Sequence, residues 1–286
     1  MEQSEYQSLL MPGITDKVAY SGIEGAFAHI AAEKIFPQGE LISYKNFGDA
    51  YQAVLDGTCA YAVLPVENSY AGEVGVVMDL MFEGPLHMAG MYAMQVSQNL
   101  LGVPGAKKEE IELVVSHPQA LDQCAEYVKA HGMKTKEAVN TARAAKEVAD
   151  AGDPKVAAIA SLKTAQLYGL SVLEESINQS SINQTKFAVL TKKGMLRDNA
   201  DVFSMMFTVK NEAGALARVI FEIGLHAINM RVIRSRPIKS TPWEYYFYVE
   251  LEGKEDSEGV QNLLSKLEST CESVKILGYY KDVTLQ

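Results

Sequence analysis

The sequence contains few cysteines and no long apolar run. Its three cysteines, Cys59, Cys124 and Cys271, lie far apart and form no Cys-x-x-Cys pair. This spacing argues against a disulfide framework and a thiolate metal site, and it favours a reducing cytoplasm. No stretch approaches the roughly 20 consecutive apolar residues that span a membrane. The N-terminus, with Glu2 and Glu5, lacks the pattern of a secretory signal, so we expect a cytoplasmic protein without a membrane partner.

Basic residues are also scarce. The 286-residue chain has 26 Lys and Arg against 36 Asp and Glu, a net charge of −10. Such a chain repels phosphate, which argues against nucleic acid as a partner. The five histidines are scattered, without a His-x-x-x-His pair, so no metal site is predicted. A small anion remains an acceptable ligand, since helix termini and a few cations can make one cleft locally positive.

Two common catalytic motifs are missing or incomplete. No Gly-x-Ser-x-Gly elbow occurs, so hydrolytic chemistry has no support. Gly22 and Gly25 follow an apolar run, but the third glycine, the lysine and the ribose-binding acid of nucleotide motifs do not accompany them. We therefore expect no nucleotide site.

Short apolar runs alternate with helical patterns from Lys17 to about Gly169, which predicts an α/β architecture. The number of elements suggests two lobes around a cleft, with the Met- and Gly-rich segment 76–103 crossing between them and its methionines filling the core. The expected strands are 17–20, 61–66, 112–115, 135–139 and 156–160, and the expected helices are 26–35, 142–151 and 162–168.

Small polar residues follow each of these five strands. They are Ser21, Asn68 with Ser69, Ser116, Asn140 with Thr141, and Ser161. One interpretation is that they cap the following helices, with Pro118 in a first helical turn. The other is that they converge at the carboxyl ends of the strands and bind carboxylates together with the helix N-termini. The spacing alone does not decide between the two.

The last part of the chain has a different pattern. After a polar connector at 195–201, the sequence predicts strand 202–210, helix 216–226, strands 228–233 and 243–251, helix 257–271 and strand 274–280. This βαββαβ order is typical of a small ferredoxin-like domain. We therefore expect two domains, at 17–194 and 202–282.

A candidate catalytic hydroxyl lies in the segment 183–187, Asn-Gln-Thr-Lys-Phe. We expect Thr185 in a loop before a strand at 187–191. Ordinary turn chemistry accounts for a threonine there, and the residues by themselves do not call for more.

Several segments together resemble prephenate dehydratase with a C-terminal ACT regulatory domain. The matching segments are 18–27, 64–72, 117–124 and 183–187, with Gly214-Ala215-Leu216 and Ser235-Arg236-Pro237 in the last domain. The resemblance implies a two-lobed, periplasmic-binding-protein-like catalytic domain followed by a ferredoxin-like ACT domain. It also implies conversion of prephenate to phenylpyruvate, with loss of water and carbon dioxide and without a metal or other cofactor.

The resemblance assigns roles to residues in the catalytic domain. Thr185 is the expected hydrogen-bond donor to the departing oxygen, and Glu67 is the second candidate for a catalytic acid. The residues expected to bind substrate are Lys186, Phe187, Asn68, Ser69, Ser21, Gly22, Asn140 and Thr141.

In the last domain the resemblance implies an allosteric site for L-phenylalanine at a subunit interface, and hence a homodimer or homotetramer. The residues expected to bind this effector are Gly214, Ala215, Leu216, Asn229, Ser235, Arg236 and Pro237.

The chain departs from the family pattern at two places. Lys186 replaces an arginine, which removes a planar bidentate donor, and Arg143 is a candidate to compensate. Arg234 replaces a glutamate beside the expected effector site. Two other functions stay open: arogenate dehydratase, and a non-catalytic sensor of aromatic amino acids. Residues 1–16 are a candidate remnant of a linker to a fused chorismate mutase.

Overall fold

The computed structural model describes residues 10, 11, 13–179, 183–194 and 199–285. Most of the expected linker at 1–16 and most of the expected connector at 195–201 therefore lie outside the described residues. The chain forms two compact units, and each combines separate segments. Unit 1 contains Met1–Gly75, Tyr92–Phe187 and Thr284–Gln286, and unit 2 contains Val76–Met91 and Ala188–Val283. The domain limits 17–194 and 202–282 stay a prediction.

The first sheet has seven strands, in the order β16-β5-β11-β3-β1-β2 with β4 paired to β3. Strands β1 and β2 are parallel, as are β1 and β3. The strands are β1 (Lys17–Ser21), β2 (Glu40–Tyr44), β3 (Tyr61–Asn68), β4 (Gly72–Glu73), β5 (His87–Gln95), β11 (Gln184–Thr191) and β16 (Asp282–Leu285). The associated helices are α2 (Phe27–Ile35), α3 (Phe47–Leu55) and α4 (Gly75–Glu83).

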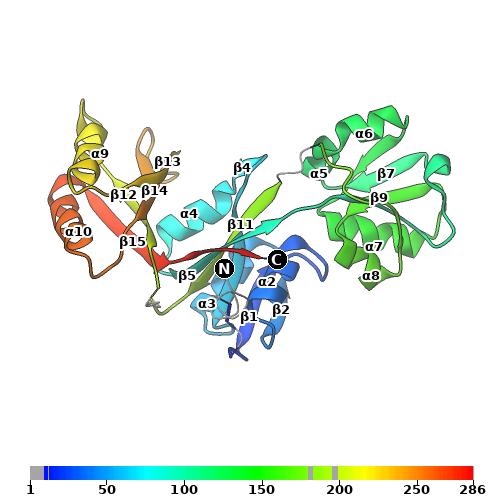
Figure 1. Cartoon of the computed structure of the whole chain (residues 1–286), viewed down its shortest axis with the longest axis horizontal. Coiled ribbons are helices and arrows are strands. Elements are labelled where there is room, and N and C mark those ends of the chain that lie inside the picture. Colours follow the sequence, from blue (N-terminus) through cyan, green and yellow to red (C-terminus); the bar gives the residue numbers. More distant parts are fainter. Residues whose placement is uncertain (1–9, 12, 180–182, 195–198, 286) are drawn as a thin grey trace. The chain divides into compact units, whose positions relative to one another are not determined.

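The second sheet has five strands, in the order β10-β6-β9-β7-β8. These are β6 (Asn99–Gly102), β7 (Leu113–Ser116), β8 (Lys134–Glu137), β9 (Val156–Ala160) and β10 (Ser171–Glu174). Helices α5 (Pro118–Gln123) and α6 (Ala125–Ala130) cover one face, and α7 (Thr141–Ala151) and α8 (Leu162–Tyr168) cover the other (Figure 1). Because successive strand residues face opposite sides, Val114 and Val115 belong to two different cores.

Two chain crossings join these sheets, from β5 to β6 and from β10 to β11. The prediction that segment 76–103 passes between two lobes is confirmed. The core role of its methionines is confirmed too, because Met78, Met81, Met88, Met91 and Met94 are all buried. The two-lobed α/β architecture expected for the catalytic part is therefore present.

The capping prediction is confirmed at two of the five strand ends. The side chains of Asn140 and Ser161 accept hydrogen bonds from backbone N–H groups of α7 and α8. It is wrong at Ser21, because α2 begins six residues later without a side-chain cap. It is also wrong at Asn68, which caps a turn before β4, and at Ser116, because the side chain of His117 caps α5.

The glycine pair of the incomplete nucleotide motif has a backbone explanation. Gly22 and Gly25 have φ values of 103° and 87°, in a region that residues with a Cβ rarely adopt. Both lie in the turn between β1 and α2. They therefore shape this turn, and no phosphate-binding role is needed to account for them.

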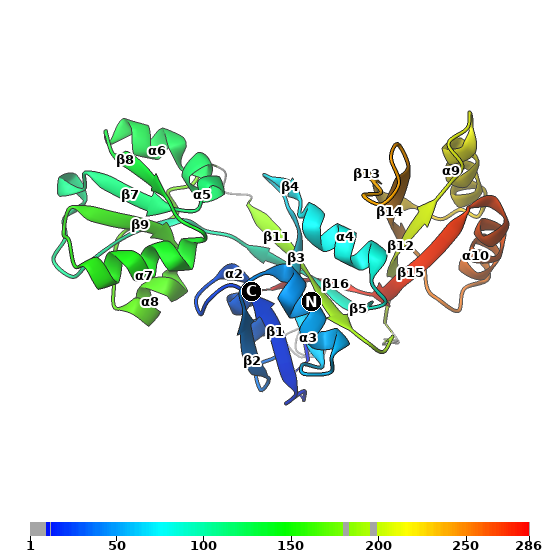
Figure 2. The same cartoon turned by 180° about the vertical axis from the view of Figure 1, so that it is seen from behind.

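The C-terminal segment forms a four-stranded sheet, in the order β13-β14-β12-β15. Its elements are β12 (Val202–Thr208), α9 (Ala215–Leu225), β13 (Met230–Pro237), β14 (Tyr245–Glu252), α10 (Glu258–Thr270) and β15 (Ser273–Tyr280). The predicted βαββαβ order is confirmed. Both helices lie on one face of this sheet (Figure 2), where Val219 of α9 and Leu263 of α10 join the core around Phe203 and Phe207.

Two details of this segment differ from the sequence prediction. Strand β13 continues to Pro237 and pairs with β14 along its length, so it extends four residues past the predicted end at 233. The chain then adds β16 to the first sheet, which the sequence pattern did not predict.

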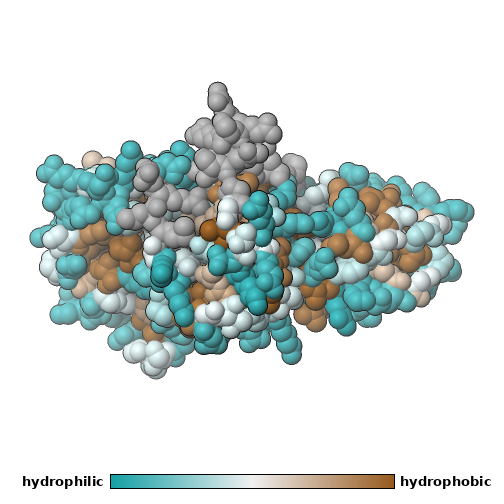
Figure 3. All heavy atoms as spheres, turned by 90° about the horizontal axis from the view of Figure 1, so that it is seen from below, coloured by the Kyte–Doolittle hydropathy of each residue, from teal (hydrophilic) through white to brown (hydrophobic). Residues whose placement is uncertain are grey.

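The surface agrees with the composition. In the view of Figure 3, hydrophilic residues predominate and apolar residues lie among them in small groups. Within the described ranges, no helix has the length and the hydropathy needed to cross a bilayer.

Candidate functional site

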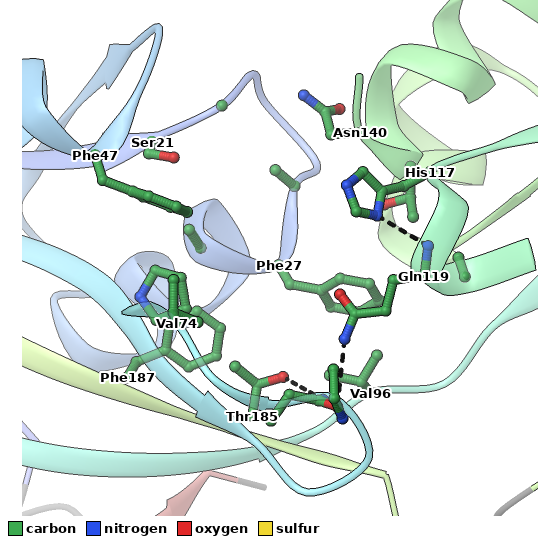
Figure 4. Close-up of a pocket in the computed structure, with 18 of the residues that line it drawn as sticks. Ser21, Phe27, Phe47, Val74, Val96, His117, Gln119, Asn140, Thr185 and Phe187 are labelled. Carbon is green, nitrogen blue, oxygen red and sulfur yellow. Dashed lines mark hydrogen bonds between the residues drawn. The ribbon is translucent and has the colours of Figure 1, made fainter. Parts of the chain in front are cut away.

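A cavity of about 570 Å³ lies within unit 1. Segments from both of its sheets line it: the turns after β1 and β2, the β3–β4 hairpin, the β5–β6 crossing, the starts of α5 and α7, and β11. Three aromatic rings contribute to the wall, those of Phe27, Phe47 and Phe187 (Figure 4). The volume and the mixed apolar and polar wall are typical of a small-molecule site.

The structure brings seven of the predicted catalytic and substrate-binding residues to this cavity. They are Ser21, Gly22, Asn68, Asn140, Thr141, Thr185 and Phe187. The interpretation that polar residues at the carboxyl ends of the strands converge is therefore supported at three of the five strand ends, whereas Ser116 and Ser161 do not line the cavity.

Three predicted residues, Glu67, Ser69 and Lys186, are not among those that line the cavity. Thr185 lies within β11 rather than in the expected loop, and alternation along this strand puts Lys186 on the face opposite Thr185. The same alternation separates Glu67 from Asn68 on β3. Ser69 instead joins β3 to β11, because its hydroxyl accepts from the N–H of Gln184 at 3.0 Å.

Asn68 organises the polar wall of the cavity. Its Oδ1 accepts from the backbone N–H groups of Tyr70, at 3.0 Å, and Ala71, at 2.9 Å. Because a backbone N–H can only donate, these bonds establish which end of the amide is the oxygen. The Nδ2 group therefore faces β11, where it donates to Asn183 Oδ1 at 2.8 Å and to Thr185 Oγ1 at 3.0 Å.

The Thr185 hydroxyl is oriented by this contact. It accepts from Asn68, which occupies one of its lone pairs, so its own proton points elsewhere. Thr185 is 9% exposed and lines the cavity. Within the described part of the chain, the Thr185 hydroxyl makes no hydrogen bond other than the one from Asn68. Its proton can therefore be donated to a ligand.

The polar network continues away from Thr185. Asn183 donates to Gln123 Oε1 at 2.9 Å, and Gln98 donates to the same oxygen at 3.3 Å. Gln119 also reaches Asn68 Oδ1, at 3.5 Å. These amides come from the β5–β6 crossing, from α5 and from the start of β11, so they hold segments from the two sheets of unit 1 together around the cavity.

Sequence inspection missed several lining residues: Phe27, Lys45, Phe47, Gln98, His117, Gln119 and Gln123. For two of them a signal exists, since Gln119 and Gln123 are four residues apart on a helix that follows a strand. For Lys45 and Phe47 there is none, because a lysine and a phenylalanine at a β–α junction are unremarkable in a sequence.

The predicted compensation by Arg143 is wrong. Arg143 does not line the cavity. Its Nε lies 3.4 Å from Glu147 Oε1, one turn further along the exposed face of α7. The described lining residues include one cationic side chain, that of Lys45, and one anionic side chain, that of Glu73.

A second cavity, of about 150 Å³, lies within unit 2 near the start of α9. Ala215 and Leu216 line it, together with residues 209–212, Trp243, Glu244, Tyr245 and Phe247. Gly214, with a φ of 82°, supplies the turn before α9. The other expected effector residues, Asn229, Ser235, Arg236 and Pro237, are not among its lining residues, and neither is Arg234.

Arg236 has a different partner. Its Nε lies 3.0 Å from Oδ1 of Asp79, a buried residue of α4. The same carboxylate accepts from the Tyr246 hydroxyl at 2.8 Å and pairs with Lys239 Nζ at 2.9 Å. The prediction that Arg236 contacts an effector is not supported, because its guanidinium is bound to the α4 carboxylate within unit 2.

No group of three or more His, Cys, Asp or Glu side chains that could hold a metal ion occurs among the residues whose positions are described.

Comparison with known proteins gives one consistent family. The family model "Prephenate dehydratase" matches residues 18–195. A curated relative from Arabidopsis thaliana, arogenate dehydratase/prephenate dehydratase 1, chloroplastic, is 35% identical over 280 residues, which cover 92% of this chain and 71% of the relative.

Two solved structures have closely similar folds. One, described as GqqA, a novel type of quorum quenching acylase, has a TM-score of 0.85 at 26% identity and covers 93% of this chain and 98% of its own. The other is a prephenate dehydratase from Arthrobacter aurescens in complex with L-Phe. It has a TM-score of 0.85 at 24% identity, and the match covers 92% of this chain and 89% of the solved chain.

Proposed function

Because the chain belongs to the prephenate dehydratase family, we propose that it converts prephenate to phenylpyruvate in L-phenylalanine biosynthesis. The observation that carries this proposal is the Asn68–Thr185 pair, which presents an oriented hydroxyl proton to a cavity with an aromatic wall. A substrate that becomes an aromatic ring and loses a hydroxyl group matches both features.

The reaction needs a stabilised leaving oxygen more than it needs a strong acid. In prephenate the ring carboxylate at C1 and the hydroxyl at C4 lie at opposite ends of the ring. The electron pair of the C1–carboxylate bond moves into the ring, carbon dioxide leaves, and the C4–O bond breaks with its pair on oxygen. The oxygen leaves as hydroxide and takes up a proton from solvent to form water. Thr185 donates a hydrogen bond to this oxygen as charge develops on it. A threonine hydroxyl is too weak an acid to transfer its proton fully.

The neighbouring residues support this donor. Asn68 orients the hydroxyl, and Phe187, which shares its strand face, packs in the wall where the ring forms. Ser21, Asn140 and Thr141 are proposed donors to the substrate from the cavity wall. Glu67 and Ser69 flank Asn68, and Lys186 follows Thr185 in β11. We assign these three residues to the positioning of the strands.

Lys45 is the proposed cationic contact for this dianionic substrate. Replacing it with methionine should raise the KM for prephenate roughly tenfold and leave kcat within about twofold, because a charge-assisted hydrogen bond at an exposed side chain is lost equally from substrate and transition state. Steady-state kinetics measure both constants. Lys45→Arg is the matched control and should keep a KM close to that of the wild type. An unchanged KM in the methionine variant would remove Lys45 from the binding site.

We further propose that L-phenylalanine regulates the enzyme through the βαββαβ segment, which we assign as an ACT domain of a homo-oligomer. Support comes from the Gly214–Leu216 turn beside the small cavity and from the fold shared with the protein solved with L-Phe. Saturating L-phenylalanine should lower the rate severalfold, and calorimetry should detect its binding to the whole protein. The absence of both effects would contradict this regulation.

Arogenate dehydratase is the second candidate, because the Arabidopsis relative carries both activities in its name. The test is a comparison of kcat/KM for prephenate, followed as phenylpyruvate, with kcat/KM for arogenate, followed as phenylalanine. A higher value for prephenate is expected. If neither substrate reacts while L-phenylalanine binds, the non-catalytic sensor becomes the better description.

A further inference from the structure

His117 lies between β7 and α5 and lines the cavity. Its Nδ1 accepts a hydrogen bond from the backbone N–H of Gln119 at 3.2 Å. Because that N–H can only donate, Nδ1 carries no proton in the neutral ring, and the proton is on Nε2. The contact also holds the plane of the ring, since it caps the first turn of the helix.

The imidazole is kept neutral by its surroundings. Burial lowers the pKa of His117, and the carboxylate of Glu137 on β8 opposes this shift without cancelling it. Protonation at Nδ1 would in addition break the cap, because two N–H donors would then face each other. The side chain therefore presents a fixed, uncharged N–H donor. Its Nε2–H makes no hydrogen bond with the described part of the protein.

Figure 4 shows where this donor lies relative to the reacting hydroxyl. His117 and Asn140 project into the cavity from the segments of the second sheet, and Thr185 projects from β11, across the cavity. Gln119 instead extends from α5 toward Asn68, beside Thr185. With the C4 oxygen at Thr185, the far end of the ring, which carries both carboxylates, points away from β11. A donor on the opposite wall is in the right region to meet this end.

We infer that His117 is a further substrate-binding residue, whose Nε2–H donates to the side-chain carboxylate of the substrate; this inference rests on the proposed dehydratase function. The ring carboxylate is the poorer partner. Its negative charge must pass into the ring as carbon dioxide leaves, so a donor held against it would oppose the reaction. The side-chain carboxylate keeps its charge throughout, and prephenate, arogenate and phenylpyruvate all have it.

Such a contact is equally strong in substrate, transition state and product. Its loss should therefore appear in KM and in product affinity, with little effect on kcat. The informative variant is His117→Asn, because asparagine is a good N-cap and keeps the hydrogen bond from Gln119, but its short side chain has no donor at the position of Nε2. His117→Ala removes the cap and the donor together and measures the cost of losing both.

In His117→Asn we expect the KM for prephenate and the inhibition constant of phenylpyruvate to rise by a common factor of roughly ten to a hundred. The melting temperature and kcat should stay near the wild-type values. An unchanged KM in this variant would show that His117 only caps α5. A higher KM with an unchanged inhibition constant would move the contact to the ring carboxylate and overturn the assignment. A wild type that turns over neither prephenate nor arogenate would overturn the proposed function and this inference together.

Discussion

Replacing Thr185 with valine should lower kcat for prephenate roughly a hundred- to a thousandfold and leave KM within a fewfold. The substitution keeps the shape of the side chain but removes the proton that, in the proposed mechanism, stabilises the departing oxygen. Loss of one preorganised donor to a developing negative charge costs about this much in other enzymes. Steady-state formation of phenylpyruvate, followed by absorbance with prephenate as substrate, measures the change directly.

The fold should tolerate this substitution. Asn68 Nδ2 keeps two acceptors, Asn183 Oδ1 at 2.8 Å and the Gln184 carbonyl at 3.2 Å, so no buried donor is left unpaired. Thr185→Ser is the matched control, because it retains a hydroxyl that Asn68 can orient, and it should keep most of the activity. A valine variant with a kcat close to that of the wild type would exclude Thr185 as the donor to the leaving oxygen.

Replacing Asp79 with alanine should destabilise unit 2 by about 3 kcal/mol. Asp79 is 6% exposed, and its carboxylate holds Arg236 and the buried Tyr246 hydroxyl. Alanine removes the acceptor of both groups, and the loss of one partner from a buried ion pair costs more than the pair itself contributes. Urea unfolding followed by circular dichroism, together with hydrogen exchange in α4, should detect the loss.

Lys239 supplies the control for this prediction. It pairs with the same carboxylate, at 2.9 Å, but its side chain is 65% exposed. Exposed ion pairs contribute little, so Lys239→Ala should change stability by less than about 1 kcal/mol. Equal losses of stability in Asp79→Ala and Lys239→Ala would contradict the assignment of Arg236 and Tyr246 as the partners through which Asp79 stabilises unit 2.

The contribution of Asp79 should also depend on pH. Burial alone would raise the pKa of Asp79, but hydrogen bonds from Arg236, Lys239 and Tyr246 outweigh it and hold the pKa below its usual range. A carboxyl with a depressed folded-state pKa stabilises the protein above its unfolded pKa, near 4. The stability difference between wild type and Asp79→Ala should therefore be complete at neutral pH and shrink as the pH falls below about 4.

Local chemistry accounts for the parts of the fold that the sequence predicted well. The helix that begins after Ser161 and the one after Asn140 could be located because a capping side chain and an apolar spacing occur within a few residues of each other. The βαββαβ order could be predicted for the same reason. Element ends were less certain where pairing decides them. Strand β13 continues to Pro237 because β14 offers backbone pairing partners as far as Tyr245. No local signal in the sequence encodes that length.

The residues of the candidate site show the same difference between local and tertiary signals. Asn68, Thr185 and Phe187 were recognisable because they belong to two short segments, 64–72 and 183–187, that resemble the family. The sequence spacing alone did not decide whether the polar strand ends converge. Which side chains face the cavity was decided by the folded chain. Strand alternation directs Thr185 inward and leaves Lys186 on the other face of β11. The partner of Arg236 was decided in the same way, by packing of α4 against strands more than 150 residues later in the sequence. Sequence thus determined the family, the order of elements and the candidate hydroxyl of Thr185, because these depend on neighbours along the chain. Tertiary structure decided the orientation of that hydroxyl, the position of His117 in the cavity wall and the salt bridge of Arg236, because each depends on residues that only folding brings together.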